Sequence, residues 1–358
     1  VRLLVESGRR GGVLGMTDYT VQTAPLRHIP SILGHLGCSP EQVLESVGLS
    51  AGAFESPENQ IPYESGASLL DTSARVSDHE SFGLLLGQRF SLIELGLVGR
   101  MANTSASVMT ALHVMIEGFH LHDTGGIITL DNSTRLMSLG YRSILPRAVS
   151  VSQVNDMCLA CLCRVMRELC GPDWSPARVE FTRPRPADEV PYREFFRAPI
   201  SFGAKRNVLS FSGRWLDRPL LSSDLERHMA LINEAHGRLK SGSPELATEV
   251  RRLLHRRLYL GGFGSGEIAD ALSMHERTLR RRLRQEKTSF STLLDEVRQT
   301  SSYQLLNDTE LSIGEVAREL GYSSTDAFDH AFRRWHGVSP RKWRGLCNAP
   351  GRSVELLH

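Results

Sequence analysis

Two segments near the C-terminus repeat one pattern of apolar residues. In each segment a small residue is followed, ten or eleven positions later, by two apolar residues that lie four apart. These residues are Ala269, Leu279 and Leu283 within 267–283, and Ala317, Phe328 and Phe332 within 313–332. A small residue, a turn and two anchors are typical of a helix-turn-helix unit, whose second helix keeps its outer faces free. The spacing therefore predicts two such units in tandem.

Positive charge is concentrated on the second helix of the first unit. Positions 277–287 hold six basic residues and one acidic residue, Glu286, although the formal net charge of the whole chain is only +2. A basic run is more often a solvated helix face. Here the run falls on the helix that the apolar pattern independently leaves exposed. It therefore predicts local attraction to the phosphate groups of a nucleic acid.

The tandem units closely resemble the C-terminal region of the AraC/XylS family of bacterial transcription regulators. The resemblance also includes the helical connector 289–307 and the sequence 337–344, and its most specific part is 312–344. It implies an all-α C-terminal domain in which two helix-turn-helix units, joined by one long helix, read adjacent major-groove segments of double-stranded promoter DNA. It also makes RNA polymerase a candidate partner.

The resemblance assigns roles to the arginines of the first recognition helix. In the family, the positions corresponding to Arg277, Arg280 and Arg281 often reach base edges. Arginine suits this task because its planar guanidinium can donate two hydrogen bonds to one guanine. Arg282 and Arg284 are assigned to phosphate contacts.

The second recognition helix lacks this positive charge. By the same resemblance its DNA-facing positions are Ser324, Thr325, Asp326, Asp329 and His330. Aspartate repels phosphate but can accept a hydrogen bond from a cytosine amino group, so the second unit either adds little affinity or reads a cytosine-containing step. Arg333, Arg334 and Lys342 remain candidates for backbone contacts. Protonation of His330 would favour binding at lower pH.

Helical and strand-like patterns are mixed in the N-terminal part of the chain. Helical patterns cover 39–47, 64–76, 82–89, 107–120 and 149–169, and strand-like segments cover 126–130, 135–141, 177–182 and 208–212, the first two as a hairpin. This mixture predicts an α+β domain with helices against a small sheet. From Tyr63 through 96–99 to 215–219, the region resembles the arabinose-binding-type N-terminal domain of regulators of the ornithine-utilisation type. The resemblance implies a domain that senses a small-molecule effector and forms a homodimer, without establishing a sugar as the effector.

The length of 358 residues indicates more than one domain. We expect a mobile leader at 1–16, the sensing and dimerisation domain at 17–220, a linker at 221–243, the DNA-binding domain at 244–346 and a tail at 347–358. The leader lacks the long apolar core of a secretory signal, and no apolar run approaches the ~20 residues of a membrane span. The six cysteines do not form the pattern of a small secreted disulfide framework. These features favour a cytoplasmic protein with no membrane contact.

Four cysteines lie close together on the helix predicted at 149–169 and just after it. Cys158 and Cys161 share one helix face and Cys163 and Cys170 another, so four thiolates could meet at one metal ion only if the helix unwound. Cysteine is also a common small buried residue. We therefore favour a core role, with a thiol- or metal-responsive sensor as the alternative.

Three histidines form a second candidate cluster. His113 and His120 lie seven apart and can share a helix face, and His122 stands beside Asp123. Imidazoles and a carboxylate can bind a metal ion, but they can equally line a pocket. We favour a weak ligand-binding role for His113, His120 and His122 and expect neither a metal nor another cofactor.

The leading hypothesis is therefore a transcription regulator controlled by a small effector. One alternative is a constitutive DNA-binding protein with a purely structural N-terminal domain. Another is a DNA-modifying or repair enzyme with a DNA-tethering tail, which the sequence disfavours because it holds none of the common nucleophile-and-base motifs. We expect no enzymatic activity.

Overall fold

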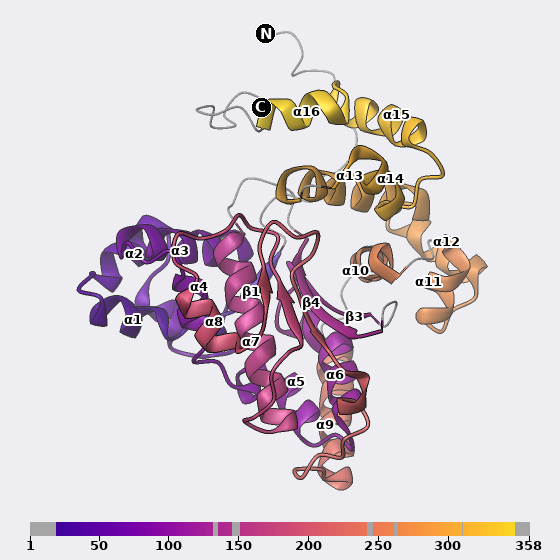
Figure 1. Ribbon diagram of the computed structural model, residues 1–358. Coiled ribbons are helices and arrows are strands. Elements are labelled where there is room, and N and C mark those ends of the chain that lie inside the picture. The colour runs from indigo at the N-terminus through magenta and orange to yellow at the C-terminus, as the bar shows by residue number, and fades with distance from the viewer. Residues whose placement is uncertain are drawn as a thin grey trace. The chain divides into compact units, whose positions relative to one another are not determined.

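The computed structural model describes residues 19–131, 135–144, 151–241, 246–260, 264–309 and 311–347 (Figure 1). The chain divides into an N-terminal unit that ends at Pro244 and a C-terminal unit that begins at Glu245. Within the described residues, the N-terminal unit combines helices with strands and the C-terminal unit is helical. The predicted α+β and all-α domains are therefore confirmed. The expected leader, and the expected tail beyond Cys347, lie outside the described residues.

The N-terminal unit contains a five-stranded sheet with the strand order β3-β4-β7-β5-β6. The strands are β3 (Gly126–Asp131), β4 (Met137–Ser143), β5 (Arg178–Glu180), β6 (Ile200–Ser201) and β7 (Val208–Phe211). Strands β3 and β4 pair antiparallel, with Ile128 opposite Tyr141, which confirms the predicted hairpin. Residues 132–134 of its turn lie outside the described residues. A separate antiparallel pair joins β1 (Thr20–Gln22) to β2 (Gln60–Pro62).

Nine α-helices are described in the N-terminal unit. They are α1 (Ile29–His35), α2 (Pro40–Ser46), α3 (Tyr63–Val76), α4 (Phe82–Gly87), α5 (Leu97–Asn103), α6 (Val108–Gly118), α7 (Ser152–Cys170), α8 (Val190–Phe196) and α9 (Leu225–Ser241). Polar side chains fix some of the helix starts, because Ser39 accepts from the Gln42 amide and Ser107 from the Thr110 amide. The sequence predicted α2, α3, α4, α6 and α7, but not α1, α5 or α8.

Helix α7 lies against the sheet and carries much of the core (Figure 1). Leu159 and Met166 are fully buried on it. Its neighbour α4 approaches so closely that glycine is required: a Cβ atom on Gly83 would lie 2.1 Å from the Gln153 carbonyl oxygen, and one on Gly87 would lie 2.4 Å from that of Met157. The Gln153 side chain also accepts a hydrogen bond from the Gly83 amide at 2.7 Å. The contact therefore depends on backbone packed against backbone.

Helix α9 falls within the segment 221–243, which we expected to be a linker. Its buried Leu231 and Ala235 form a small apolar cluster with Leu97 of α5. Thr104 and His228 are also hydrogen-bonded, with 3.1 Å between Oγ1 and Nδ1. Most of this segment is thus an ordered helix of the N-terminal unit.

The described C-terminal unit contains seven helices. They are α10 (Leu246–Leu260), α11 (Ser265–Ala271), α12 (Glu276–Gln285), α13 (Phe290–Asp308), α14 (Ile313–Glu319), α15 (Thr325–His336) and α16 (Pro340–Cys347). The four predicted anchors Leu279, Leu283, Phe328 and Phe332 are all 0% exposed, and Ala269 and Ala317 are 1% exposed. The apolar pattern therefore identified the core correctly. Among the described residues of either unit, no helix is both long and apolar enough to cross a membrane.

The contact between α4 and α7 leads to a stability prediction. Gly83→Ala and Gly87→Ala should each lower the free energy of unfolding by about 1–3 kcal/mol, because the added methyl group must displace backbone. Gly34→Ala in α1 is the matched control, since nothing lies within 4 Å of the place that its methyl group would take; it should be neutral or stabilising by up to about 1 kcal/mol. Urea unfolding of the three variants checks this. Equal stability of all three would show that the two helices separate easily.

Candidate nucleic-acid interface and pocket

The two helix-turn-helix units have nearly the same turn. In the first unit the Met274 amide donates to the Ala269 carbonyl at 2.8 Å, and in the second the Tyr322 amide donates to the Ala317 carbonyl at 2.9 Å. The preceding residues, Ser273 and Gly321, have φ angles of +51° and +71°. The left-handed turn residue lets the chain reverse within a few residues and present the second helix.

Helix α12 presents its arginines to solvent. Arg277, Arg280, Arg281 and Arg284 are all exposed, as is Arg282, on the faces away from buried Leu279 and Leu283. His275 caps the start of the helix, because its Nδ1 accepts from the Arg277 amide at 3.3 Å. Every basic residue that the sequence assigned to this helix is therefore accessible.

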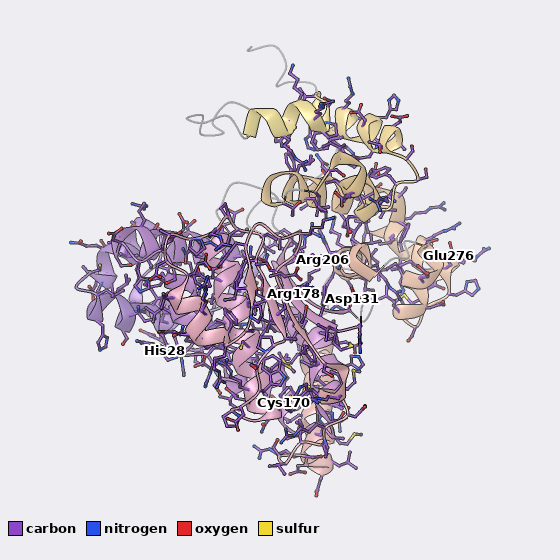
Figure 2. The ribbon with its side chains drawn as sticks, viewed as in Figure 1. His28, Asp131, Cys170, Arg178, Arg206 and Glu276 are labelled. Carbon is purple, nitrogen blue, oxygen red and sulfur yellow. The ribbon has the colours of Figure 1, made fainter. Side chains whose placement is uncertain are left out.

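Glu276, which is labelled in Figure 2, pairs with one of these arginines. Its carboxylate forms an ion pair with Arg280 and accepts a hydrogen bond from the Ser265 hydroxyl of α11. The hydrogen bonds from Ser265 and then Arg280 lower the pKa of Glu276. Sequence reasoning did not include this contact, although the four-residue spacing between Glu276 and Arg280 is a recognised signal for helix ion pairs.

Glu286, the one acidic residue of the basic run, forms hydrogen bonds within the C-terminal unit. Its carboxylate accepts hydrogen bonds from the amides of Leu246 and Ala247, at 2.9 and 2.7 Å. These amides belong to the first turn of α10, where unpaired donors and the helix dipole favour a negative charge. Glu286 therefore stabilises α10 instead of pairing with the exposed arginines.

Helix α15 presents a different surface. Ser324, Thr325, Asp326, His330 and Arg333 are exposed and Asp329 is half-buried. The Arg333 Nε donates to Asp329 Oδ2 at 2.6 Å, and Arg334 donates to Asp295 of α13 at 2.6 Å. Ser324 caps the helix by accepting from the Ala327 amide at 3.1 Å. Both arginines of this helix are thus already paired with carboxylates.

The connector helix α13 holds the second unit through Arg298. Its guanidinium donates to the carbonyls of Leu320 and Gly321, at 2.9 and 3.0 Å, and lies 4.6 Å from the centre of the Tyr322 ring. These carbonyls lie at the end of α14, where helical hydrogen bonds run out. At α10, which precedes the first unit, Arg251 donates to Glu296 of α13 at 2.8 Å. Charged contacts therefore join the connector to the second unit and to α10.

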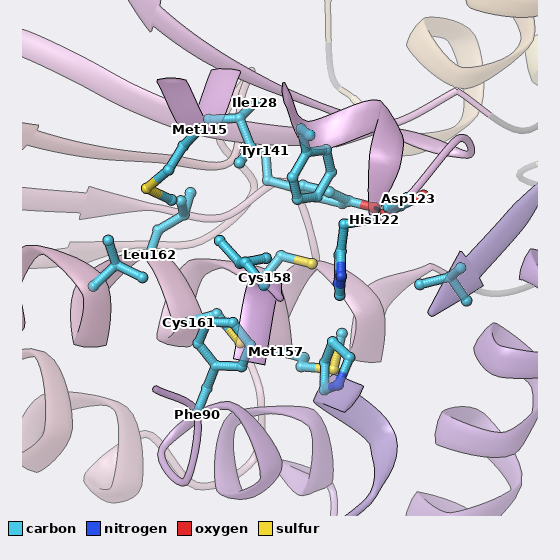
Figure 3. A pocket seen from close by; sticks show the side chains of 15 residues that line it. Phe90, Met115, His122, Asp123, Ile128, Tyr141, Met157, Cys158, Cys161 and Leu162 are labelled. Carbon is cyan, nitrogen blue, oxygen red and sulfur yellow. Dashed lines mark hydrogen bonds between the residues drawn. The ribbon is translucent and has the colours of Figure 1, made fainter. Parts of the chain in front are cut away.

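A small pocket of about 50 Å³ lies in the N-terminal unit (Figure 3). Its residues come from segments far apart in the sequence: Val21, Pro25, Phe90, Leu95, Met115, Phe119, His122, Asp123, Ile128, Tyr141, Met157, Cys158, Cys161, Leu162 and Val165. A second pocket of about 30 Å³ shares Asp123, Tyr141 and Cys158 with it and extends to Tyr63 and α3. Most of the lining is apolar, as in pockets for small organic ligands.

The polar groups of the pocket gather on one side, where Figure 3 shows His122, Asp123 and Tyr141 together. Tyr141 donates to Asp123 Oδ2 at 3.2 Å, and the Tyr63 and Tyr141 hydroxyls lie 2.6 Å apart. The Gly125 amide donates to Asp123 Oδ1 at 2.7 Å. Burial raises the pKa of Asp123 to about 7 despite these donors, and burial lowers the pKa of His122 to about 4. The carboxyl is thus partly protonated at neutral pH and the imidazole is neutral.

The predicted histidine cluster does not come together. His122 lines the pocket, whereas His113 is exposed on α6 and the His120 ring faces the Glu117 carbonyl at 2.8 Å. Among the described residues, no group of three or more histidine, cysteine or acidic side chains is arranged to hold a metal ion. The sequence missed Tyr63 and Tyr141, because tyrosine in a helix or strand carries no local signal of a pocket.

The four cysteines of α7 lie in two different environments. Cys158 and Cys161 line the pocket, whereas Cys163 and Cys170 are buried in the core. Burial raises the pKa of the Cys158 and Cys161 thiols well above their usual range, and that of Cys163 and Cys170 to about 11. Since the thiolate is the reactive form, these side chains are poor nucleophiles at neutral pH.

Comparison with known proteins identifies the family. Residues 37–220 match the arabinose-binding N-terminal domain of AraC transcription regulators, and residues 268–345 match a helix-turn-helix domain. The chain belongs to the AraC family and is a DNA-binding transcription regulator with an arabinose-binding-type N-terminal domain. This confirms the family that the sequence motifs resemble.

Relatives match along most of the chain. The regulator VirS of Mycobacterium tuberculosis is 25% identical over 323 residues, which cover 90% of this chain and 95% of VirS. The ornithine utilization regulator of Pseudomonas aeruginosa is 25% identical over 334 residues, or 91% of this chain and 98% of that protein. The crystal structure of the regulator CdpR from Pseudomonas aeruginosa aligns with 90% of this chain and 98% of its own, at 22% identity and a TM-score of 0.46.

The contacts of Arg298 lead to a prediction about local stability. Arg298→Met keeps the aliphatic stem but leaves the Leu320 and Gly321 carbonyls without their donor, which should cost about 1.5–3 kcal/mol. Hydrogen exchange in 313–336 should therefore become faster. Arg318→Met on the exposed side of α14 is the control and should leave exchange unchanged. If Arg298→Met exchanged like the control, α14 and α15 would not depend on the connector.

Proposed function

We propose that this regulator recognises promoter sequences mainly through α12, while its N-terminal domain binds a small effector and pairs two chains. The single observation that carries the DNA part is the row of exposed arginines on α12. Glu276 pairs with Arg280, and Glu286 caps α10 instead of pairing with the other arginines of the row. Helix α15, whose Arg333 is paired with Asp329, would add less affinity. Arg277, Arg280 and Arg281 are proposed to contact bases, and Arg284 to contact phosphate.

The proposed base contacts can be separated from phosphate contacts by mutation. Arg281→Ala should weaken binding to the operator by about 5- to 150-fold and change binding to random DNA little, since a bidentate arginine contributes about 1–3 kcal/mol of discrimination. Arg282→Ala is the matched control: it should weaken both DNAs similarly and reduce the salt dependence by about one ion. Titrations at several salt concentrations check this, once footprinting or selection has defined the operator.

The opposite pattern would contradict the assignment of roles. If Arg281→Ala reduced affinity for operator and random DNA by the same factor, Arg281 would be a phosphate contact. If neither arginine mattered, α12 would not be the recognition helix.

The effector part of the proposal is supported by the pocket in the N-terminal domain. Its lining is mostly apolar with a few polar groups on one side, the common composition of sites for small organic molecules. The raised thiol pKa values of Cys158 and Cys161 argue against the thiol-responsive alternative. The relatives are transcription regulators, so we propose regulation rather than catalysis as the activity of this chain.

Homodimerisation, cytoplasmic location and contact with RNA polymerase complete the proposal. Light scattering on the purified full chain should give about twice the monomer mass of 39.8 kDa. Operator DNA with two half-sites should then bind two chains together. A monomer mass at micromolar concentrations, with or without operator, would contradict the dimer.

A further inference from the structure

The polar side of the pocket offers hydrogen-bond acceptors. The Gln22 amide nitrogen donates to the Leu121 carbonyl at 3.2 Å, which turns its oxygen toward His122 Nδ1 at 3.0 Å. Because Gln22 Oε1 can only accept, Nδ1 must carry the imidazole proton. The other nitrogen, Nε2, is then an acceptor, and no residue among those described donates to it.

The neighbouring hydroxyl groups of Tyr63 and Tyr141 already donate hydrogen bonds to other residues. Tyr141 donates to Asp123, so the 2.6 Å contact with Tyr63 requires Tyr63 to donate to Tyr141. Asp123 in its ionised form accepts from the amides of Gly125 and Gly126 and from Tyr141, which leaves one of the about four lone-pair sites of the carboxylate for a further donor. A donor group brought to this side of the pocket would therefore find two acceptors, His122 Nε2 and the Asp123 carboxylate.

The rest of the pocket excludes a negative charge. No arginine or lysine is among its described lining residues, and the side away from Asp123 is formed by side chains such as Phe90 and Leu162 (Figure 3). A ligand carboxylate or phosphate would lose its hydration, find no cation and face Asp123. An apolar ligand without a donor would leave the buried acceptors unsatisfied.

From this geometry we propose that the effector is a primary amine with an apolar body, whose ammonium group binds Asp123 and His122 Nε2. This inference rests on the proposed function of the pocket as the effector site. An ammonium group supplies three hydrogen-bond donors. It also supplies a positive charge, and the buried carboxylate has no cationic partner among the described residues that face it. The aliphatic or aromatic body of the amine would fill the space lined by Phe90, Met115 and Leu162.

Binding of such an amine should release a proton. The titratable groups that face Asp123 are Tyr63 from α3, Tyr141 from β4, Cys158 from α7 and the adjacent His122, and none of them is a cation at neutral pH. With its pKa raised to about 7, Asp123 is mostly protonated at pH 6 and must lose that proton to pair with an ammonium ion. About 0.9 proton should leave at pH 6 and about 0.1 at pH 8, and the affinity should rise with pH up to about 7 and then level off.

The test uses the full chain and three probes of equal length: heptylamine, heptanol and heptanoate. Isothermal titration in buffers of different ionisation enthalpy gives affinity and proton release together. We expect heptylamine to bind at least tenfold more tightly than either other probe, and to release most of one proton at pH 6 but little at pH 8. Asp123→Asn should lose at least tenfold in heptylamine affinity, whereas Asp173→Asn, which changes an exposed aspartate of the same unit, should change nothing.

The outcomes separate this inference from the proposal on which it rests. Tighter binding of heptanol or heptanoate would overturn the amine but leave the pocket as an effector site. Heptylamine affinity unchanged in Asp123→Asn would also overturn it. If no probe bound at millimolar concentration, both this inference and the effector pocket would be rejected. Should Asp123→Asn fail to fold, the order of the three probe affinities for the unaltered chain still decides.

Discussion

The burial of two apolar anchors on each second helix is the constraint on which DNA recognition depends. Leu279 and Leu283 in one unit, and Phe328 and Phe332 in the other, are fully removed from solvent. Burial of each such side chain stabilises the fold by about 1.5–3 kcal/mol, more than any exposed ion pair contributes. Because an α-helix turns through 100° per residue, fixing the buried side of α12 also fixes which of its arginines point outward. The position of the positive charge thus follows from apolar packing.

Two units with the same framework differ in how their charges are used. In the first, Glu286 caps α10, so most of the arginines of α12 face solvent without an acidic partner nearby. In the second, Asp329 and Asp295 neutralise Arg333 and Arg334. An exposed ion pair is weak and easily exchanged, yet an arginine must give up such a pair before it can bind phosphate. The same scaffold therefore supports a strongly attracting unit and a weakly attracting one, and Arg298 joins the second of them to α13.

The sequence predicted features that depend on local periodicity, and it missed those that depend on distant contacts. The anchors of the two helix-turn-helix units, the long α7 and the β3–β4 hairpin each repeat over enough residues to be recognised. Helices α1, α5 and α8 span only seven residues each, and none of them starts with a side-chain cap such as Ser39, which marks the equally short α2. The sequence predicted a linker where α9 lies, because the composition of this segment is mostly polar and only a few residues, such as Leu231, pack against α5. His122 lines the pocket, but the sequence singled it out for its spacing from His113 and His120, which are not among the lining residues.

The pocket and its hydrogen bonds could not have been predicted, because Gln22, Tyr63, Asp123 and Tyr141 come from four separate segments of the chain and form a site only when these segments fold together. Its chemistry also bears on regulation. A ligand shifts a conformational equilibrium only by the difference between its affinities for the two states. Such a difference requires a protein group that interacts with the ligand more favourably in one state than in the other. Asp123 is such a group, since burial makes its charge costly whenever no cation is present. A bound cation would remove that cost in any conformation that keeps Asp123 buried. It would therefore stabilise the closed form of the pocket more than any form in which water already solvates the carboxylate.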